Sequence, residues 1–282
     1  MIPDEKLLAR FGKSRNELIR ITDAHTLDVQ AWLSSRSPQA KTISGKGIRA
    51  SSTGIKVPIL NLALGCNFPE EASLPTINAE IRKLKEFFAE RNVPWYWWMN
   101  TRPSPSNIGE ILKQHGFISD EVPLPAMIAP IPKDINTLPV HPEDIQVWRA
   151  ETIEDLRYAS TIRRRAFKFT EGEALTYFED MSSDWLDSSS RARLFLAGKS
   201  KSEPVSIGAI IYGAGIPGIY VMATLPEHHR QGYGKAIMRK LLWEAKSFEG
   251  DFIALTASEA GFGLYSQFGF IHLFGFNFYE LP

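Results

Sequence analysis

The fold of this chain is decided by the stretch Leu225-Pro226-Glu227-His228-His229-Arg230-Gln231-Gly232-Tyr233-Gly234-Lys235-Ala236-Ile237. Two glycines stand where a strand-like pattern gives way to a helix-like pattern, and basic residues surround them. Glycine adopts backbone angles that other residues avoid, and it puts no Cβ between the backbone and a ligand. The first turn of the helix adds unpaired N–H groups and a partial positive charge. The stretch therefore predicts a site for a diphosphate.

Two familiar nucleotide motifs fit this loop poorly. The lysine after Gly234 is also found in a P-loop, but Ala236 stands where Ser or Thr would hold magnesium. A dinucleotide fingerprint needs three glycines at its own spacing and an acidic residue about 20 residues later. A glycine pair can also do no more than close a strand-to-helix turn, and that alternative stays open at this point.

The flanking sequence gives the order strand, glycine loop, helix, strand, helix, strand. Residues 216–225 read as a buried strand, and apolar residues then recur at helical steps until Gly250. Residues 252–257 form a short apolar strand, 259–268 a short helix, and 270–279 alternate like a strand. Such an order predicts helices packed on a sheet.

From about residue 145 to 282 the chain resembles the GCN5-related N-acetyltransferase (GNAT) superfamily. The acetyl-CoA loop of the family reads Arg/Gln-x-x-Gly-x-Gly/Ala, and this chain has His229-Arg230-Gln231-Gly232-Tyr233-Gly234. His229 departs from the pattern at the first position, and Arg230 beside it can supply the charge. The family's second element, Leu-Tyr-x-x-x-Gly-Phe, corresponds to 264–270. Ser258 stands where the family often has Asn.

The resemblance implies acetyl-CoA as the co-substrate, no metal, and a set of cofactor-binding residues. The loop amides on the diphosphate would be those of Arg230, Gln231, Gly232, Tyr233, Gly234 and Lys235. In the family, the strand before the loop pairs with the pantetheine arm, and the matching residues are Met222 and Thr224. Ser258 either hydrogen-bonds that arm or only caps the following helix.

Tyr265 is the candidate catalytic residue, as a general acid for the departing thiolate. A phenol with a pKa near ~10 stays protonated at neutral pH and can donate to a thiolate. Packing of the ring on the sheet is the alternative role. The sequence does not identify a general base. The candidates are Glu227, His228 and His229 near the loop, and Glu171 and Glu173 after the first helix of this half.

The first half of the chain echoes the second. Strand-like residues 57–64, a helix at 77–90, a strand at 94–99 and a helix at 107–115 follow in the same order. At the loop position the sequence is Gly65-Cys66-Asn67-Phe68-Pro69-Glu70-Glu71, without a glycine pair and with two carboxylates that would repel a diphosphate. Leu112 stands at the position that matches Tyr265. This half is predicted to bind no acetyl-CoA.

We therefore predict the α/β fold class, with two GNAT-like domains in tandem, each a central mixed, mostly antiparallel sheet flanked by helices. The predicted domains are 1–135, a degenerate GNAT-like domain, and 145–282, the catalytic one. Four prolines within residues 128–142 favour an extended connector between them.

Composition narrows the remaining possibilities. The formal net charge is +0 with 32 basic and 32 acidic residues, which argues against a generally basic nucleic-acid binder. A single cysteine, Cys66, allows no intrachain disulfide and fits a reducing cytosol, where we expect it as a buried filler.

No apolar run reaches the ~20 residues of a membrane helix, so no membrane partner is expected. Two fused copies mimic a dimer and favour a monomer. Trp95, Trp97 and Trp98 are expected in a core rather than as a stacking platform for bases.

The functional prediction is an acetyl-CoA-dependent N-acetyltransferase in the cytoplasm. It would transfer acetyl to a primary amine by direct attack in a ternary complex, with a small molecule or a peptide as acceptor. The alternative is a non-catalytic acyl-CoA-binding sensor or regulatory module. The sequence does not identify the acceptor.

Overall fold

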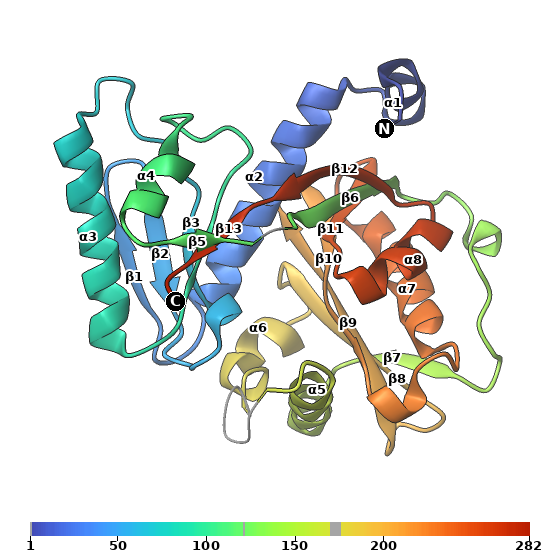
Figure 1. The fold of residues 1–282 in the computed structure, drawn as a ribbon. Helices are drawn as coiled ribbons and strands as arrows, with labels where there is room; N and C mark the ends of the chain where they lie inside the picture. Colours follow the sequence, from blue (N-terminus) through green and yellow to red (C-terminus); the bar gives the residue numbers. More distant parts are fainter. Residues whose placement is uncertain (1, 121, 170–175) are drawn as a thin grey trace. The chain divides into compact units, whose positions relative to one another are not determined.

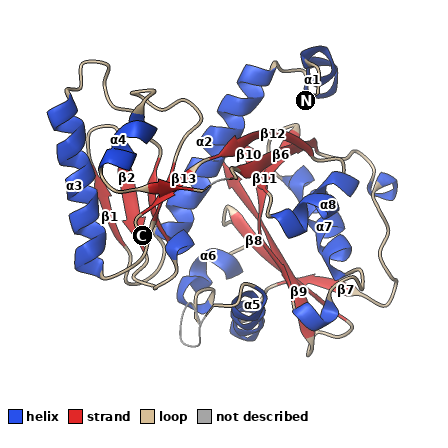
Figure 2. Cartoon of the chain, in the orientation of Figure 1, coloured by secondary structure: helices blue, strands red, loops and turns tan. Residues whose placement is uncertain are grey.

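The computed structural model describes residues 2–120, 122–169 and 176–282 of the chain. These residues form two compact units. The large unit comprises Met1–Thr26 and Pro125–Phe274, and the small unit comprises Leu27–Leu124 and Gly275–Pro282. Each unit contains a mixed sheet flanked by helices (Figure 2), as the sequence predicts for the fold class.

The small unit is built on a sheet with the strand order β1-β2-β3-β4-β13-β5. Its strands are β1 (Lys41–Ser44), β2 (Arg49–Ser52), β3 (Asn61–Leu64), β4 (Tyr96–Trp98), β5 (Ile118–Ser119) and β13 (Phe278–Glu280). Only the β3–β4 pair among the named pairs of this sheet is parallel. Its helices are α3 (Leu74–Arg91) and α4 (Ile108–Gln114).

The core of the small unit explains the tryptophans. Helix α3 buries Ile77, Ile81, Leu84 and Phe88, which recur at helical steps and face the strands. Phe88 stacks on Trp95 with 4.3 Å between ring centroids. Trp97 is fully buried, and its Nε1 donates a hydrogen bond to the carbonyl of Gly65 at 2.8 Å. The expected core position of these rings is confirmed.

The large unit is built on a sheet with the order β12-β6-β11-β10-β9-β8-β7. Its strands are β6 (Leu124–Pro130), β7 (Gln146–Arg149), β8 (Ala192–Gly198), β9 (Pro204–Gly213), β10 (Ile216–Thr224), β11 (Phe252–Thr256) and β12 (Ile271–Phe276). Its helices are α1 (Asp4–Phe11), the first part of α2 (Arg15–Ser34), α5 (Ile153–Ala166), α6 (Ser182–Leu186), α7 (Tyr233–Glu244) and α8 (Glu259–Gln267). Figure 1 shows α5 and α6 on one side of this sheet and α7 and α8 on the other.

Helix starts in the large unit follow local sequence signals. Helix α5 begins with a capping box, in which the Thr152 side chain accepts from the Asp155 amide and the Asp155 carboxylate accepts from the Thr152 amide. Helices α1 and α2 were not foreseen from the sequence, and they bury Leu7, Phe11 and Leu18 in a core with Phe252 and Ile128.

Two strands cross between the halves of the sequence. Strand β6, from the first half, pairs antiparallel with β11 from Phe252↔Pro130 to Thr256↔Ala126. Strand β13, at the end of the second half, pairs with β4 and β5. The boundaries of the compact units therefore differ from the predicted domain ranges 1–135 and 145–282. Those ranges describe where two copies of one fold would begin and end, and they stay a prediction.

Two local predictions need correction. Residues 128–130 are strand rather than connector, because their neighbour β11 supplies hydrogen bonds; the proline stands at the strand end, where its missing N–H costs least. The single strand expected over 270–279 is two strands, since Asn277 interrupts it and its carbonyl accepts a hydrogen bond from the Met99 amide at 3.0 Å.

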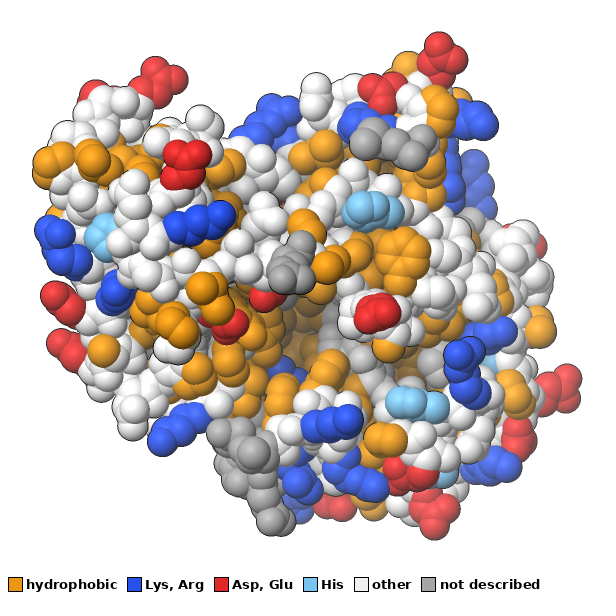
Figure 3. Space-filling model, in the orientation of Figure 1, with side chains coloured by type: hydrophobic (Ala, Val, Ile, Leu, Met, Phe, Trp, Pro, Cys, Tyr) orange, Lys and Arg blue, Asp and Glu red, His pale blue; other side chains and the backbone are white. Residues whose placement is uncertain are grey.

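On the face drawn in Figure 3, acidic and basic side chains lie interspersed rather than gathered by sign. Among the described helices, none combines the length and apolar composition that a bilayer crossing requires.

Candidate active site

Strand β10 carries a break in its regular backbone near its carboxyl end. Val221 has φ +53°, which is uncommon for a β-branched residue, and the register with β9 shifts between Tyr220 and Ala223. The parallel ladder with β11 consists of Gly218↔Ala254 and Ile219↔Leu255 in the described chain, although β10 continues to Thr224. The two strands therefore part beyond Ile219 and leave a strand edge without a strand partner on that side.

The side chains of Met222 and Thr224 are occupied within the protein. A Cβ built on Gly208 of β9 would lie 2.5 Å from Met222 Sδ and 2.4 Å from Ile237 Cγ2, so Met222 packs toward α7 through the gap that this glycine leaves. Thr224 Oγ1 lies 2.8 Å from Ser206 Oγ, and its carbonyl accepts from His229 Nε2 at 2.9 Å. A ligand at this strand edge would therefore contact the backbone of Met222 and Thr224 rather than their side chains.

The loop after β10 contains two residues in the left-handed region. Arg230 has φ +64° and Gly232 has φ +97°, on either side of Gln231. Gly232 is the N-cap of α7, and no side chain caps the helix. The first turn also contains no acidic residue. Its N–H groups and partial positive charge are therefore arranged for an anion, as the sequence predicts for this loop.

Both glycines of the loop have packing reasons as well. A Cβ on Gly232 would lie 2.5 Å from Pro142 Cδ, and one on Gly234 would lie 3.2 Å from Leu264 Cδ2. No local signal in the sequence indicates the contact with Pro142, which lies 90 residues before Gly232. The contact at Gly234 has a useful consequence, because it packs the first turn of α7 against α8 at the residue before Tyr265.

Tyr265 lies on α8, which follows β11. Its side chain is 7% exposed, and its ring packs over Gly261, where a Cβ would lie 2.7 Å from Cε2. The ring also meets Phe270 edge-on at 6.2 Å. Burial raises the pKa of Tyr265 to about 12, so the phenol holds its proton throughout the neutral range.

Ser258 takes the capping role that the sequence left open. Its hydroxyl accepts from the Gly261 amide at 3.2 Å, at the N-cap of α8. The Ser258 side chain is exposed, and its hydrogen bond with the Gly261 amide is a capping contact within the protein.

The residues considered as a general base are engaged elsewhere or lie outside the described chain. Glu227 pairs with Arg165 at 2.6 Å, and hydrogen bonds to its own backbone and to Arg165 hold its pKa below the usual range. His229 contacts the Thr224 carbonyl, and the ring of His228 meets Tyr233 edge-on at 5.8 Å. Glu171 and Glu173 lie outside the described residues. No base is assigned.

Metal chemistry was also considered. In the ranges that the structure describes, no group of three or more His, Cys, Asp or Glu side chains is arranged to hold a metal ion.

One part of the chain matches the model of a known family. A family model described as "Acetyltransferase (GNAT) domain" matches residues 191–272, which contain β10, the glycine loop, α7 and α8. No curated protein matches the chain. Residues 191–272 therefore match a GNAT domain, and the chain has a GNAT fold.

Solved structures support the same fold along the chain. A GCN5-related N-acetyltransferase from Kribbella flavida aligns with TM-score 0.67 and 16% identity over 94% of this chain and 95% of that one. A tandem GNAT protein from the clavulanic acid biosynthesis pathway aligns with TM-score 0.58 and 12% identity over 89% and 86%. A GCN5-related N-acetyltransferase from Sphaerobacter thermophilus aligns with TM-score 0.56 and 12% identity over 86% and 75%.

Proposed function

We propose that the large unit transfers an acetyl group from acetyl-CoA to a primary amine, by direct attack of the amine in a ternary complex. The observation that carries the proposal is the parting of β10 and β11 beyond Ile219, directly before an uncapped helix start. One element offers a strand edge and the next offers an anion site, and together they suit a molecule with an extended amide-bearing arm and a diphosphate.

The residues of the loop fit the diphosphate. The amides from Arg230 to Lys235 surround the start of α7, and the Arg230 and Lys235 side chains add positive charge. Binding energy at this end, remote from the reacting atoms, would hold the thioester in position for attack. The backbone of Met222 and Thr224 would pair with the arm, and an N–H of this segment would stabilise the oxyanion.

Tyr265 would act on the leaving group. Acetyl-CoA supplies an activated thioester when it is bound, and the bond to sulfur must break as the amine nitrogen bonds to the carbonyl carbon. With a pKa of about 12, Tyr265 is a weaker acid than a thiol of pKa ~8.5, so complete proton transfer is unfavourable. Its hydroxyl would instead donate a hydrogen bond that stabilises the thiolate as it departs. The amine would lose its proton to water.

The test is thiol release from acetyl-CoA by purified protein with a panel of primary amines. Thermal unfolding with acetyl-CoA, ATP and NAD is measured in parallel, because a ligand stabilises the folded state by RT ln(1 + [L]/Kd). We expect acetyl-CoA to raise Tm and at least one amine to accelerate thiol release. Binding without acceleration by any amine would favour a sensor, and no rise in Tm with acetyl-CoA would overturn the proposal.

A further inference from the structure

Helix α5 contains a buried arginine in which two nitrogens have no hydrogen-bond partner among the described residues. Arg163 is 7% exposed, and neither its Nε nor its Nη1 has a hydrogen-bond partner in the described part of the chain. Burying a charged group costs several kcal/mol unless it is paired. Burial lowers the pKa of Arg163, yet a guanidinium starts so high that it stays charged at neutral pH.

Aromatic rings surround this guanidinium. Its Cζ lies 4.1 Å from the Tyr177 ring centroid, 5.5 Å from that of Phe169 and 5.9 Å from that of Phe178. The segment is fixed to α5 because the Phe178 amide donates to Ser160 Oγ at 3.2 Å. Cation–π contacts contribute roughly 0.5–2 kcal/mol each, which offsets only part of the burial cost. The rings surround the guanidinium, but its Nε and Nη1 groups still have no hydrogen-bond acceptor among the described residues.

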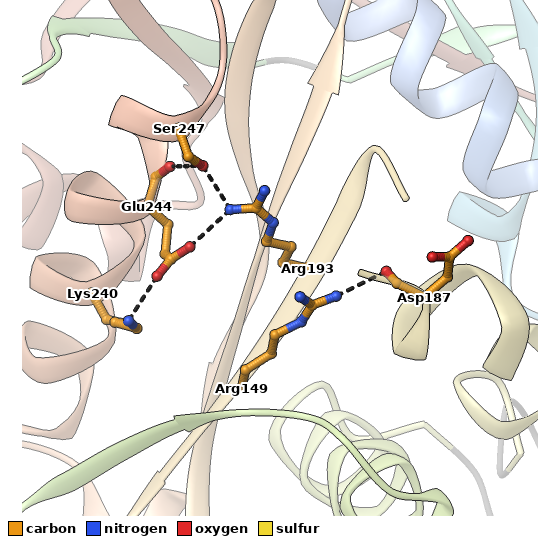
Figure 4. A network of polar contacts seen from close by, with 6 residues as sticks. All are labelled: Arg149, Asp187, Arg193, Lys240, Glu244 and Ser247. Carbon is orange, nitrogen blue, oxygen red and sulfur yellow. Dashed lines mark hydrogen bonds and ion pairs between the residues drawn. The ribbon is translucent and has the colours of Figure 1, made fainter. Parts of the chain in front are cut away.

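Other arginines of the large unit are treated differently. Arg193 is also largely buried, and its Nη1 donates to Glu244 at 2.9 Å and to Ser247 at 2.6 Å (Figure 4). Lys240 completes that network from the next turn of α7, at 2.7 Å from Glu244. On α5 itself, Arg157 pairs with Glu154 and Arg165 with Glu227. Arg164 of the same helix also leaves its Nε without a partner among the described residues, but it is only half-buried, whereas Arg163 is buried and leaves two nitrogens without one.

The position of Arg163 links it to the candidate active site. Helix α5 packs on β9 and β10. The ion pair between Arg165 and Glu227 holds the carboxyl end of α5 beside the loop that leads into α7. Phe167 is 47% exposed and stacks on Phe169 at 5.8 Å, so an accessible aromatic pair borders the buried charge.

We propose that Arg163 binds the carboxylate of the acceptor, and that the acceptor is an amino acid with an apolar side chain that contacts Phe167 and Phe169. The inference rests on the proposed function and adds the substrate class. Guanidinium and carboxylate match in charge and in bidentate geometry. The carboxylate takes no part in bond changes: the amine nitrogen gains the acetyl carbon and loses a proton, while the thiolate leaves and is protonated.

The kinetic test uses matched amines with and without the carboxylate: L-phenylalanine with phenethylamine, and L-leucine with 3-methylbutylamine. We expect wild-type kcat/KM to favour the amino acids by about 10–100-fold, the range for a charge-assisted pair. Arg163→Met should bring the ratio close to one, mainly by raising KM for the amino acids. Arg157→Met, an exposed change on the same helix, is the control and should keep the wild-type ratio.

A binding test separates this inference from the proposed function. Calorimetry compares N-acetyl-L-phenylalanine with N-acetylphenethylamine on wild type, Arg163→Met and Arg163→Lys in the presence of coenzyme A. Selective binding of the carboxylate by wild type, and its loss in Arg163→Met, would support the site even if no amine releases thiol. Equal binding of the two compounds by wild type, or selectivity retained in Arg163→Met, overturns it.

Thermal unfolding checks for a merely structural arginine. Removal of an uncompensated buried charge by Met, of similar volume, is expected to leave Tm unchanged or raised. A fall of several degrees together with unchanged carboxylate selectivity in Arg163→Met would assign Arg163 to the core and reject the proposal.

Discussion

The two units build the same strand–loop–helix junction and leave it in opposite states. In the small unit, between β3 and α3, the amides of Cys66, Asn67 and Phe68 donate to Asn100 Oδ1 at 2.8 Å, to the Gly47 carbonyl at 2.7 Å and to the Ser104 carbonyl at 3.0 Å. Ser73 caps α3 by accepting from the Thr76 amide. The donors of this junction are satisfied within the unit.

In the large unit, between β10 and α7, the helix start has no side-chain cap and no acid in its first turn. The difference teaches that a helix N-terminus becomes a ligand site only where the protein leaves its N–H groups unsatisfied. The glycines do not decide this, since Gly65 of the small unit also has a left-handed φ of +66°.

The following helices differ in the same sense. Leu112 of α4 is fully buried in the apolar core, where the large unit has Tyr265 on α8. A hydroxyl is thus present in one unit and absent from the matching place in the other.

The largest effect is expected for Tyr265→Phe. Loss of a hydrogen bond to the leaving thiolate should lower kcat by about 10²–10³-fold while the Kd for acetyl-CoA stays within about 2-fold. Steady-state kinetics and calorimetry measure the two quantities. Tyr212→Phe, a half-buried tyrosine of the same unit that stacks on Phe248, is the control. Full activity in Tyr265→Phe would reduce this residue to a packing role and make the two helices equivalent.

Alkaline pH should destabilise the large unit through the same tyrosine. The unfolded chain loses this proton near pH 10 and the folded protein near pH 12, because burial raises the pKa of Tyr265 to about 12. Between these values the unfolded state binds fewer protons, so the free energy of unfolding falls as pH rises. Two pKa units correspond to about 3 kcal/mol.

Denaturant unfolding at pH 9 and pH 11.5 tests this in wild type and Tyr265→Phe, and the variant should lose less stability over the interval.

Cys66 is the buried titratable group for the same experiment in the small unit. Burial raises the pKa of its thiol to about 12 from 9.0, so Cys66→Ala should diverge from wild type already above pH 9. An identical pH profile for Tyr265→Phe and wild type would contradict the assignment.

Charge changes in the loop before α7 should alter the affinity for acetyl-CoA, whereas charge changes in the loop before α3 should not. Gln231→Glu combined with Lys235→Glu would give the large unit the acidic character of Glu70 and Glu71. We expect the Kd for acetyl-CoA to rise about 10–100-fold at low salt and the effect to shrink as salt is added. Glu70→Gln with Glu71→Gln should leave the Kd unchanged. Equal Kd values for all these proteins would place the diphosphate elsewhere.

Much of the large unit can be predicted from the sequence, because its signals are local. Periodicity predicted the helices α7 and α8 within a few residues, and the glycine loop predicted a helix start with unpaired N–H groups at α7. Strands β1, β2, β8 and β9 and helices α1 and α2 were not foreseen. The exchange of β6 and β13 between the sheets could not be foreseen either, since a strand's pattern shows which face is buried and not which sheet it joins.

The site was predictable to the same extent. The residue types of the loop predict an anion site, and this stays a prediction. The positive φ of Val221 and the parting of β10 and β11 depend on pairing with other strands, so no local signal could show them. Arg163 stands in a run of three arginines, Arg163 to Arg165, which by itself is typical of a charged helix surface. Only the packing of Tyr177 and Phe178 over it, from a segment 14 residues further along the chain, makes it a buried cation.

The smallest effect concerns the left-handed residue that each junction contains. Gly65→Ala should lower the free energy of unfolding by about 1 kcal/mol, because alanine is strained at this φ. The nearest side chain, Leu27 Cδ1 at 3.6 Å, is at an ordinary contact distance and adds no clash. Arg230→Gly should have the opposite sign, up to about 1 kcal/mol of stabilisation, since glycine relieves strain at φ +64° and Arg230 is exposed.

Denaturant unfolding of both variants at neutral pH measures the pair, and Lys56→Ala provides a reference for an exposed loop change. Because Arg230 also faces the proposed diphosphate site, Arg230→Gly should bind acetyl-CoA a few-fold more weakly while it unfolds later. Such opposite effects are expected if backbone strain is kept at the loop where the proposed ligand would bind, and is absent at Gly65, where glycine only turns the chain. If Arg230→Gly were less stable than wild type, the loop would not hold Arg230 in the left-handed region in solution.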